Sequence, residues 1–339
     1  MIDVAELFKM LIAESEMENS KDVYKLKPIY FQRPFLLIGL DLLTLERRLY
    51  VDITDEDWNK EQLNSFPKWK GLSITAEHFE KIGQLEDKTF LVIAQASDQS
   101  EEIIEKVLQS LIDHIFVGGE SALYMTVYEV LDRWHNFFRN KTDKRLSLEE
   151  QMGVFGELYY IQNYLTKLPD YPPLVIDYWE GPTRGRVDFV KNGVGVEIKT
   201  SSPKIRNEIR ISSEKQLELN PVIKSIYLYV LEVEAAQTDG QTIQQLIDSI
   251  RRELVARAPS SLVKFNDLLL GLYIVDGVYD DTRFYVHKET AFEVKESFPR
   301  ITSEHVPVGV SNLSYTIDLS HCLDFQIDSE KIYYLGREG

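Results

Sequence analysis

The apolar and polar positions along the first part of the chain predict an N-terminal α+β domain. Residues 3–14 have helical periodicity, short apolar runs typical of antiparallel strands follow, and two amphipathic helices come last. The predicted strands are Phe35–Leu40, Leu49–Ile53, Leu72–Ala76 and Phe90–Ala94, and the predicted helices run from Ile104 to the Gly118-Gly119 stop and over 121–138. A polar, basic stretch at 139–145 then reads as a linker, so we expect domains at 1–145 and 146–339.

The second part predicts a mixed sheet flanked by helices. Ser147-Leu-Glu-Glu150 is a capping box that opens a helix, and Pro169 and the prolines after it end that helix. Ile226–Val233 is almost continuously apolar, which is typical of a central strand covered on both faces. The remaining predicted elements are a hairpin at about 184–200, a strand at 209–211, a helix opened by a capping box at Ser213, a helix at Thr242–Leu254, and strands at Leu268–Val275, Phe284–Val286 and Leu313–Leu319.

The hairpin carries the most informative pattern in the chain. Asn192-Gly193 is a strong signal for a type I′ turn, because both central residues of that turn need positive φ. A two-residue loop there pairs Phe189 with Val196 and sets Asp188 opposite Glu197, at roughly 4.5–5.5 Å between Cβ atoms. Lys199 lies two residues further on and shares the face of Glu197, whereas Val196 and Ile198 point to the other face, toward a core.

Two adjacent carboxylates repel each other unless a cation lies between them. A divalent metal ion is the first candidate for that cation. The alternative is structural: Asp188, Glu197 and Lys199 would form the solvated face of an edge hairpin, with Lys199 bridging the two acids.

Composition narrows the class of protein. The chain has 339 residues, no apolar run long enough for a membrane span, and a single cysteine, Cys322, from which we expect a cytoplasmic protein that makes no membrane contact. The six histidines are scattered without zinc-ligand spacing. The net charge of −17 argues against affinity for nucleic acid over the whole surface.

One local segment departs from that negative charge. Between Thr183 and Arg210 seven basic residues stand against three acids, an excess of four positive charges beside the paired carboxylates. A small basic cluster is usually solvated surface, but at this position it would also suit a DNA backbone.

The order of a helix with Glu157, then Asp188, a hairpin and Glu197-Ile-Lys199 resembles the PD-(D/E)XK nuclease superfamily over roughly residues 147–235. The whole chain is similar to a bacterial family of PD-(D/E)XK motif proteins associated with restriction-modification and phage defence. The segments that carry this narrower likeness are Gly153-Val-Phe-Gly-Glu157, Arg186-Val-Asp-Phe-Val190, Phe298-Pro-Arg-Ile301 and Tyr315-Thr-Ile-Asp318. Val187 stands where the superfamily name implies proline, a position outside the metal chemistry.

The resemblance implies an α/β (α+β) fold with a restriction-endonuclease-like core and Mg²⁺-dependent hydrolysis of DNA, with Mn²⁺ as a plausible substitute. It implies that Asp188, Glu197 and the carbonyl of Ile198 hold the metal, that Lys199 orients water or neutralises charge, and that Glu157 acts through a second metal or a water. Gly153 and Gly156 would let the helix of Glu157 approach the sheet. Nucleic-acid contacts would come from Arg184, Arg186, Lys204, Arg206, Arg210 and Gln216. Gln216 is equally the fourth residue of the Ser213 capping box, and Glu157 is equally an ordinary solvent-facing helix residue.

Two further function classes stay open. The same fold would serve as a non-catalytic DNA-binding or scaffolding subunit, which the net charge of −17 favours slightly. A nuclease for RNA or for branched structures is the third class, although the aromatic strands of common RNA-binding modules are missing from the pattern. Double-strand cleavage with one active site per chain would normally imply a dimer or a larger restriction or defence complex.

Overall fold

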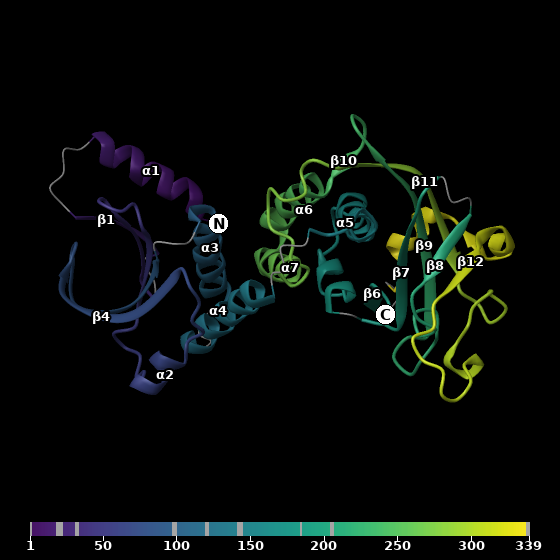
Figure 1. Ribbon diagram of the computed structural model, residues 1–339, viewed down its shortest axis with the longest axis horizontal. Helices are drawn as coiled ribbons and strands as arrows, with labels where there is room; N and C mark the ends of the chain where they lie inside the picture. The colour runs from purple at the N-terminus through teal and green to yellow at the C-terminus, as the bar shows by residue number, and fades with distance from the viewer. Residues whose placement is uncertain are drawn as a thin grey trace. The chain divides into compact units, whose positions relative to one another are not determined.

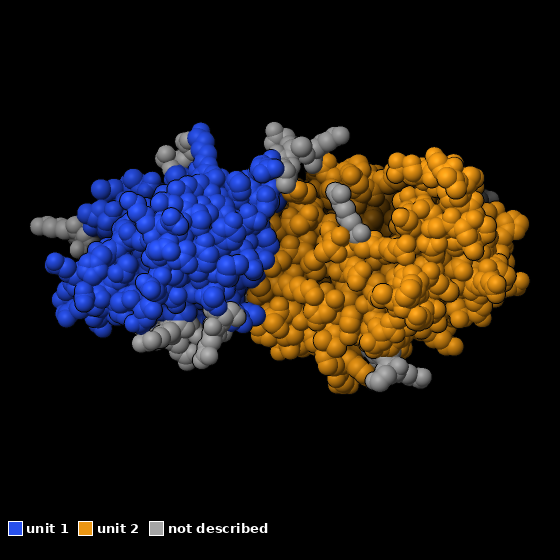
Figure 2. All heavy atoms as spheres, turned by 90° about the horizontal axis from the view of Figure 1, so that it is seen from below, with its two compact units in different colours: residues 1–142 blue, residues 143–339 orange. Residues whose placement is uncertain are grey.

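The computed structural model describes the chain in two compact units, residues 1–142 and 143–339, which Figure 2 colours blue and orange. The described residues are 2–17, 23–30, 34–96, 100–118, 122–140, 145–183, 185–203 and 207–336. The units meet within three residues of the expected division. Most of the predicted linker, residues 141–144, lies outside the described residues, and Arg139 belongs to the last helix of the first unit.

The first unit is built on an antiparallel sheet that curls strongly (Figure 1), as the apolar runs predicted. Within the described residues its strand order is β1-β2-β3-β5-β4. The strands are β1 (Tyr24–Tyr30), β2 (Leu36–Asp41), β3 (Arg47–Asp52), β4 (Leu72–Ile82) and β5 (Leu85–Gln95). β1 was not predicted, because polar residues and Pro28 interrupt its apolar pattern.

The helices of this unit are α1 (Val4–Met17), α2 (Lys60–Ser65), α3 (Glu101–Gly118) and α4 (Leu123–Asn140). Helices α1 and α3 contact this sheet, and α4 packs on α3. α1, α3 and α4 confirm the three helical predictions, and the apolar stripe of α3 from Ile104 to Ile115 is buried. α2 was not predicted, because it has no buried residue and therefore no apolar stripe in its sequence.

The second unit contains the predicted mixed sheet, in the order β10-β11-β9-β7-β6. β7 and β9 run parallel, and the other neighbours are antiparallel. The strands are β6 (Phe189–Lys191), β7 (Val194–Ser201), β9 (Ser225–Ala236), β10 (Gln241–Thr242) and β11 (Arg283–Glu293), with β13 (Gln326–Ile327) on β11 and a separate pair of β8 (Glu208–Ile211) and β12 (Tyr315–Asp318).

Both faces of this sheet are covered, which confirms β9 as a central strand. On one face, Tyr229, Leu231 and Val233 join a core with the helices; on the other, Ile226, Leu228 and Val230 pack with residues of β8 and β12. The helices are α5 (Leu148–Lys167), α6 (Ile243–Arg257) and α7 (Pro259–Gly271), and the short 3-10 turns are η1 (Leu174–Ile176), η2 (Gly181–Thr183), η3 (Ser303–His305), η4 (Leu319–Phe325) and η5 (Ser329–Tyr334). The capping boxes at Ser147 and Thr242 both form.

Two predicted elements of this unit are wrong. The helix expected from Ser213 is only a turn, because Pro221 follows within eight residues and restricts the residue before it to an extended backbone. The strand expected at Leu268–Val275 is the end of α7, which Pro259 opens. Its buried residues Leu262, Phe265 and Leu269 lie at helical spacing, and that period outweighs the short apolar run at 268–270.

No helix within the described residues is both long enough and apolar enough to cross a membrane. The surface of the second unit is hollowed on the face that Figure 2 presents.

Candidate active site

The β6–β7 hairpin has the predicted turn and register. Asn192 and Gly193 have φ of 48° and 82°, as a type I′ turn requires. Lys191 pairs with Val194, Val190 with Gly195 and Phe189 with Val196. Val196 and Ile198 point into the core beneath α5, so Glu197 and Lys199 project from the opposite face, as expected.

The expected fourth pair, Asp188 opposite Glu197, is not part of this ladder. Asp188 turns its carboxylate toward β7, where Oδ2 accepts a hydrogen bond of 2.7 Å from the Ile198 amide. Its own backbone carbonyl accepts hydrogen bonds from the amides of Glu180 and Gly181, at 2.8 and 3.2 Å. The segment before the hairpin therefore replaces a strand partner, and Asp188 closes the end of the ladder with its side chain.

Glu197 is a buried carboxyl group whose close cationic neighbour is Lys199. Its residue is 0% exposed, and among the described residues neither carboxylate oxygen has a hydrogen-bond partner. The Nζ atom of Lys199 lies 2.7 Å from Oε1 as an ion pair, but its approach lacks hydrogen-bond geometry. A buried carboxylate is costly unless it is fully paired, and Lys199 supplies only one positive charge for Glu197 and the neighbouring acids.

The electrostatics of the neighbouring acids point the same way. Burial, followed by the charge of Asp188, raises the pKa of Glu197 to about 8. Burial likewise raises the pKa of Asp188, and burial together with the charge of Asp188 raises the pKa of Glu157 well above its ordinary value. Burial alone lowers the pKa of Lys199, but the carboxylates of Glu197 and Asp188 outweigh it and raise that pKa. Three acids thus share one ammonium group.

Glu157 comes from α5, which lies close against β7. A Cβ atom on Gly156 would stand 2.7 Å from Cγ2 of Thr200, so glycine permits the approach. Gly153 has no such role, since nothing described lies within 4 Å of its Cβ position. The Glu157 carboxylate accepts a hydrogen bond of 2.5 Å from Nε1 of Trp179, a residue that sequence reasoning missed because no local pattern links positions 22 residues apart.

Gln216 reaches Lys199 from the segment at 212–224. Its Oε1 accepts from the Ser212 amide at 2.9 Å and from Lys199 Nζ at 3.3 Å. Because the predicted helix is a turn, Gln216 does not act as a capping residue. Its side chain instead contacts the ammonium group of Lys199, which also pairs with Glu197.

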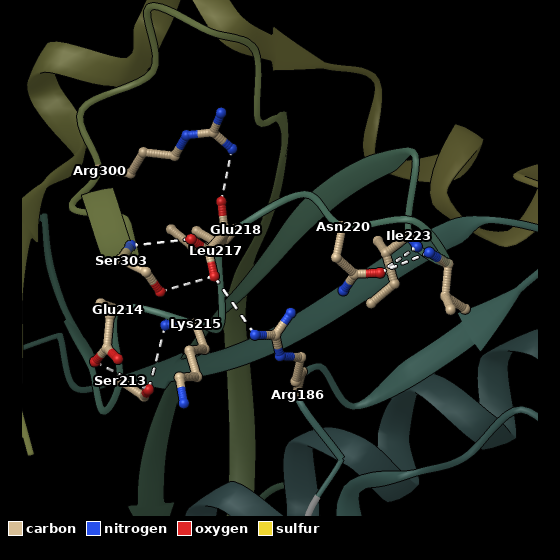
Figure 3. A network of polar contacts seen from close by, with 11 residues as sticks. Arg186, Ser213, Glu214, Lys215, Leu217, Glu218, Asn220, Ile223, Arg300 and Ser303 are labelled. Carbon is tan, nitrogen blue, oxygen red and sulfur yellow. Dashed lines mark hydrogen bonds and ion pairs between the residues drawn. The ribbon is translucent and has the colours of Figure 1, made fainter. Parts of the chain in front are cut away.

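A polar network holds this segment in place (Figure 3). Glu218 accepts hydrogen bonds of 3.0 Å from both the amide and the hydroxyl of Ser303, and Arg300 donates one of 2.6 Å to the Leu217 carbonyl. Nη2 of Arg186 lies 3.5 Å from the Glu218 carboxylate. Arg186, one of the predicted DNA contacts, thereby pairs with an acid of the protein.

Of the remaining basic residues predicted to contact DNA, Arg210 lies within the described part of the chain. Arg210 is exposed on β8, opposite Thr316 of β12. Arg184, Lys204 and Arg206 lie outside the described residues.

The donor set suits a hard divalent cation held by few protein ligands. Within the described residues, no group of three or more His, Cys, Asp or Glu is arranged to hold a metal ion. Mg²⁺, however, usually takes one or two carboxylates and keeps several waters. The unpartnered oxygens of Glu197 and the carboxylate of Asp188 match that requirement. The carbonyl of Ile198 faces the same edge as its amide, since the two groups of one strand residue point toward the same neighbour.

Comparison with known proteins gives one match. A family model described as "Putative PD-(D/E)XK family member, (DUF4420)" matches residues 33–320, which cover most of the chain. No protein with a curated description matches, and no solved structure matches. The fold is consistent with a nuclease-like α+β core.

Proposed function

Because the chain belongs to this putative PD-(D/E)XK family, we propose that it is a Mg²⁺-dependent DNA endonuclease of a bacterial restriction-modification or phage-defence system. PD-(D/E)XK nucleases generally use divalent metals, and Mn²⁺ is a suitable substitute here. The first unit would then recognise the target or a partner protein, and the second unit would cleave. A dimer or a larger complex would supply the second active site for double-strand cleavage.

The observation that carries this proposal is the condition of Glu197. A fully buried carboxyl group placed beside a second carboxylate, with one lysine to balance them, has no structural purpose in a stable core. A protein that gained nothing from this arrangement would be more stable with apolar residues in its place. Perturbed acids clustered in this way are typical of functional sites.

Each side chain has a defined task in phosphodiester hydrolysis. Asp188, Glu197 and the Ile198 carbonyl would hold the metal ion, whose chemistry is to polarise the phosphate and to acidify water. Lys199, fixed between Glu197 and Gln216, would orient the attacking water and neutralise charge that develops on the phosphate. Glu157, partly buried and held by Trp179, would accept a proton or orient a water.

DNA contacts in this proposal come from the basic residues around the hairpin. Arg186 and Arg210 are accessible to phosphate, and Arg186 would exchange its contact with Glu218 for a backbone phosphate. Arg184, Lys204 and Arg206, which lie outside the described residues, are proposed as further phosphate contacts.

The test is a cleavage assay on duplex, single-stranded, branched and modified DNA with Mg²⁺ and with Mn²⁺. We expect Asp188→Ala and Lys199→Ala each to lower the cleavage rate at least about a thousandfold while the fold stays intact by circular dichroism. Glu234→Gln, a change at the exposed acid that pairs with His287 on the same sheet, is the matched control and should cleave like the wild type. Cleavage that survives in both alanine variants would contradict the proposal.

The second candidate is a non-catalytic DNA-binding or scaffolding subunit. The net charge of −17 favours it, since a positive field helps an enzyme that meets DNA alone. Calorimetry separates the two candidates: the endonuclease binds Mg²⁺ or Mn²⁺ at millimolar concentration or below, and loses that binding in Asp188→Ala. A chain that binds no divalent metal is the subunit.

A further inference from the structure

The carboxylate of Glu157 sits in a niche formed by Trp179 and Gly181. Trp179 donates its indole hydrogen to Oε2 at 2.5 Å. The backbone of Gly181 closes the niche so tightly that a Cβ atom there would stand 2.1 Å from Oε2 and 3.0 Å from Cδ. Only glycine leaves room for the carboxylate in this position.

The indole that holds Glu157 is itself immobilised. Trp179 is 2% exposed, and its ring lies 6.0 Å from that of Phe265 on α7, centroid to centroid. Its backbone forms a bridge with Phe189, the first residue of β6. A side chain fixed by a core contact and by a strand pairing cannot follow Glu157 if the carboxylate moves.

The niche is also built from the same residue that anchors the proposed metal site. The amides of Glu180 and Gly181 both bond to the Asp188 carbonyl, while the Asp188 carboxylate bonds to the Ile198 amide. Asp188 therefore fixes the niche with its backbone and the ion-binding edge with its side chain. The result is that Glu157 stays near Asp188 and Glu197, yet the three carboxylates form no three-ligand metal group among the described residues.

We propose that Trp179 and Gly181 act as a positioning device that keeps Glu157 out of the metal coordination shell, so that Asp188 and Glu197 bind a single divalent cation without it. The inference rests on the metal site of the proposed function. Trp179 is a positioning residue in this scheme, since it acts on the ion only through Glu157. Glu157 remains available as a base beside the ion, a task that a metal-bound carboxylate performs poorly.

The experiment is a titration of the full chain with Mn²⁺, followed by calorimetry and by the electron paramagnetic resonance signal of free Mn²⁺. Trp179→Phe removes the indole donor and keeps an aromatic ring against Phe265. We expect it to tighten Mn²⁺ binding at least about tenfold or to add a second bound ion, because the freed carboxylate joins the shell as a further charged ligand. In the Glu157→Gln background, Trp179→Phe should change neither the affinity nor the stoichiometry.

Gly181→Ala provides an independent test. It leaves Trp179 intact but expels the carboxylate by steric contact, so it should shift Mn²⁺ binding in the same direction as Trp179→Phe and again only when Glu157 is present. A purely structural role for Trp179 predicts weaker binding that does not depend on Glu157.

The outcomes distinguish a failure of the proposed metal site from a failure of the positioning role of Trp179 and Gly181. If the wild type binds no Mn²⁺ at millimolar concentration, the proposed function fails. If the wild type binds Mn²⁺, and Trp179→Phe and Gly181→Ala leave the binding unchanged or weaken it, the positioning device is overturned while the metal site stands. Circular dichroism confirms that each variant compared is folded.

Discussion

Buried charge is treated in opposite ways in the two units. In the first unit, Arg47 has a side chain that is 4% exposed, and it donates to Glu105 and Glu101 at 2.8 Å each and to the Leu45 carbonyl at 3.0 Å. In the second unit, Glu197 is equally buried and has no hydrogen bond among the described residues. A charge with all its partners stabilises a fold, whereas a buried acid that lacks them and has a perturbed pKa is typical of functional sites.

The largest expected effect on stability comes from removing Arg47. Arg47→Met leaves the partly buried Glu105 without its partner, so we expect the first unit to lose about 3–5 kcal/mol of unfolding free energy. Cleavage and metal binding by the second unit should persist at temperatures where both units stay folded. Hydrogen exchange resolved by peptide measures the two units separately.

Lys264→Met is the matched control for that substitution. It breaks an ion pair of 2.8 Å with Asp177 in which both side chains are nearly half exposed, so the loss should stay under about 1 kcal/mol. If the two substitutions lower the unfolding free energy equally, the burial of Arg47 among its hydrogen-bond partners does not account for its contribution.

The pH dependence of stability offers a second, smaller effect with opposite signs in the two units. In the metal-free protein, Glu197 keeps its proton up to about pH 8, while the unfolded chain releases it near pH 4.5. The folded state therefore binds more protons between these values, and the unfolding free energy of the second unit should fall by about 2 kcal/mol or more as the pH rises through that range. Above pH 8 this contribution is constant.

In the first unit the sign is reversed. Burial alone raises the pKa of Asp52, but hydrogen bonds from Thr54 and the charge of Lys88 outweigh it and lower that pKa below 3.8. This contribution to stability is present above pH 4 and is lost on further acidification. Thermal unfolding in EDTA across pH 3–9, with Glu197→Gln as the variant, checks both signs: a slope in the second unit that persists in Glu197→Gln would exclude Glu197 as its cause.

The smallest expected effect concerns Glu218. Its carboxylate has hydrogen-bond partners and lies in the segment that carries Gln216. Glu218→Ala removes both hydrogen bonds to Ser303, so we expect a loss of about 1 kcal/mol. Cleavage should fall up to about tenfold, because the segment that fixes Gln216 beside Lys199 becomes less constrained.

Glu218→Gln serves as the comparison for that change. The amide oxygen still accepts from Ser303 while the charge facing Arg186 is gone. Near wild-type cleavage by the glutamine variant assigns the effect to the position of the segment; a tenfold loss in both variants assigns it to the charge.

The sequence predicts those parts of the site that depend on local chemistry. Asn192-Gly193 sets the turn and the register through its positive φ values, and Ser147 with Glu150 sets the start of α5. Both signals act within a few residues, where propensity and capping dominate. The alternation of β7 then places Val196 and Ile198 in the core and leaves Glu197 on the opposite face.

Long-range contacts account for what the sequence does not reveal. Two hydrogen-bonded contacts join positions far apart in the chain: Trp179 with Glu157, and Ser303 with Glu218. No local sequence pattern indicates either of them. The helix predicted from the capping-box pattern at Ser213 does not form, because Pro221 prevents a helix from extending through this segment. Asp188 does not pair with Glu197 in the strand ladder, because its carboxylate accepts a hydrogen bond from the Ile198 amide.

The two-residue turn of the hairpin also limits how the gene for this protein can change. A single codon inserted at 192–193 that shifted the register by one residue would send Glu197 into the core and bring Ile198 to the proposed site, although the codons of all its residues would be intact. Substitutions in the surrounding loops carry no such penalty. Over evolutionary time the length of this turn should therefore be inherited more strictly than the identity of most residues around it.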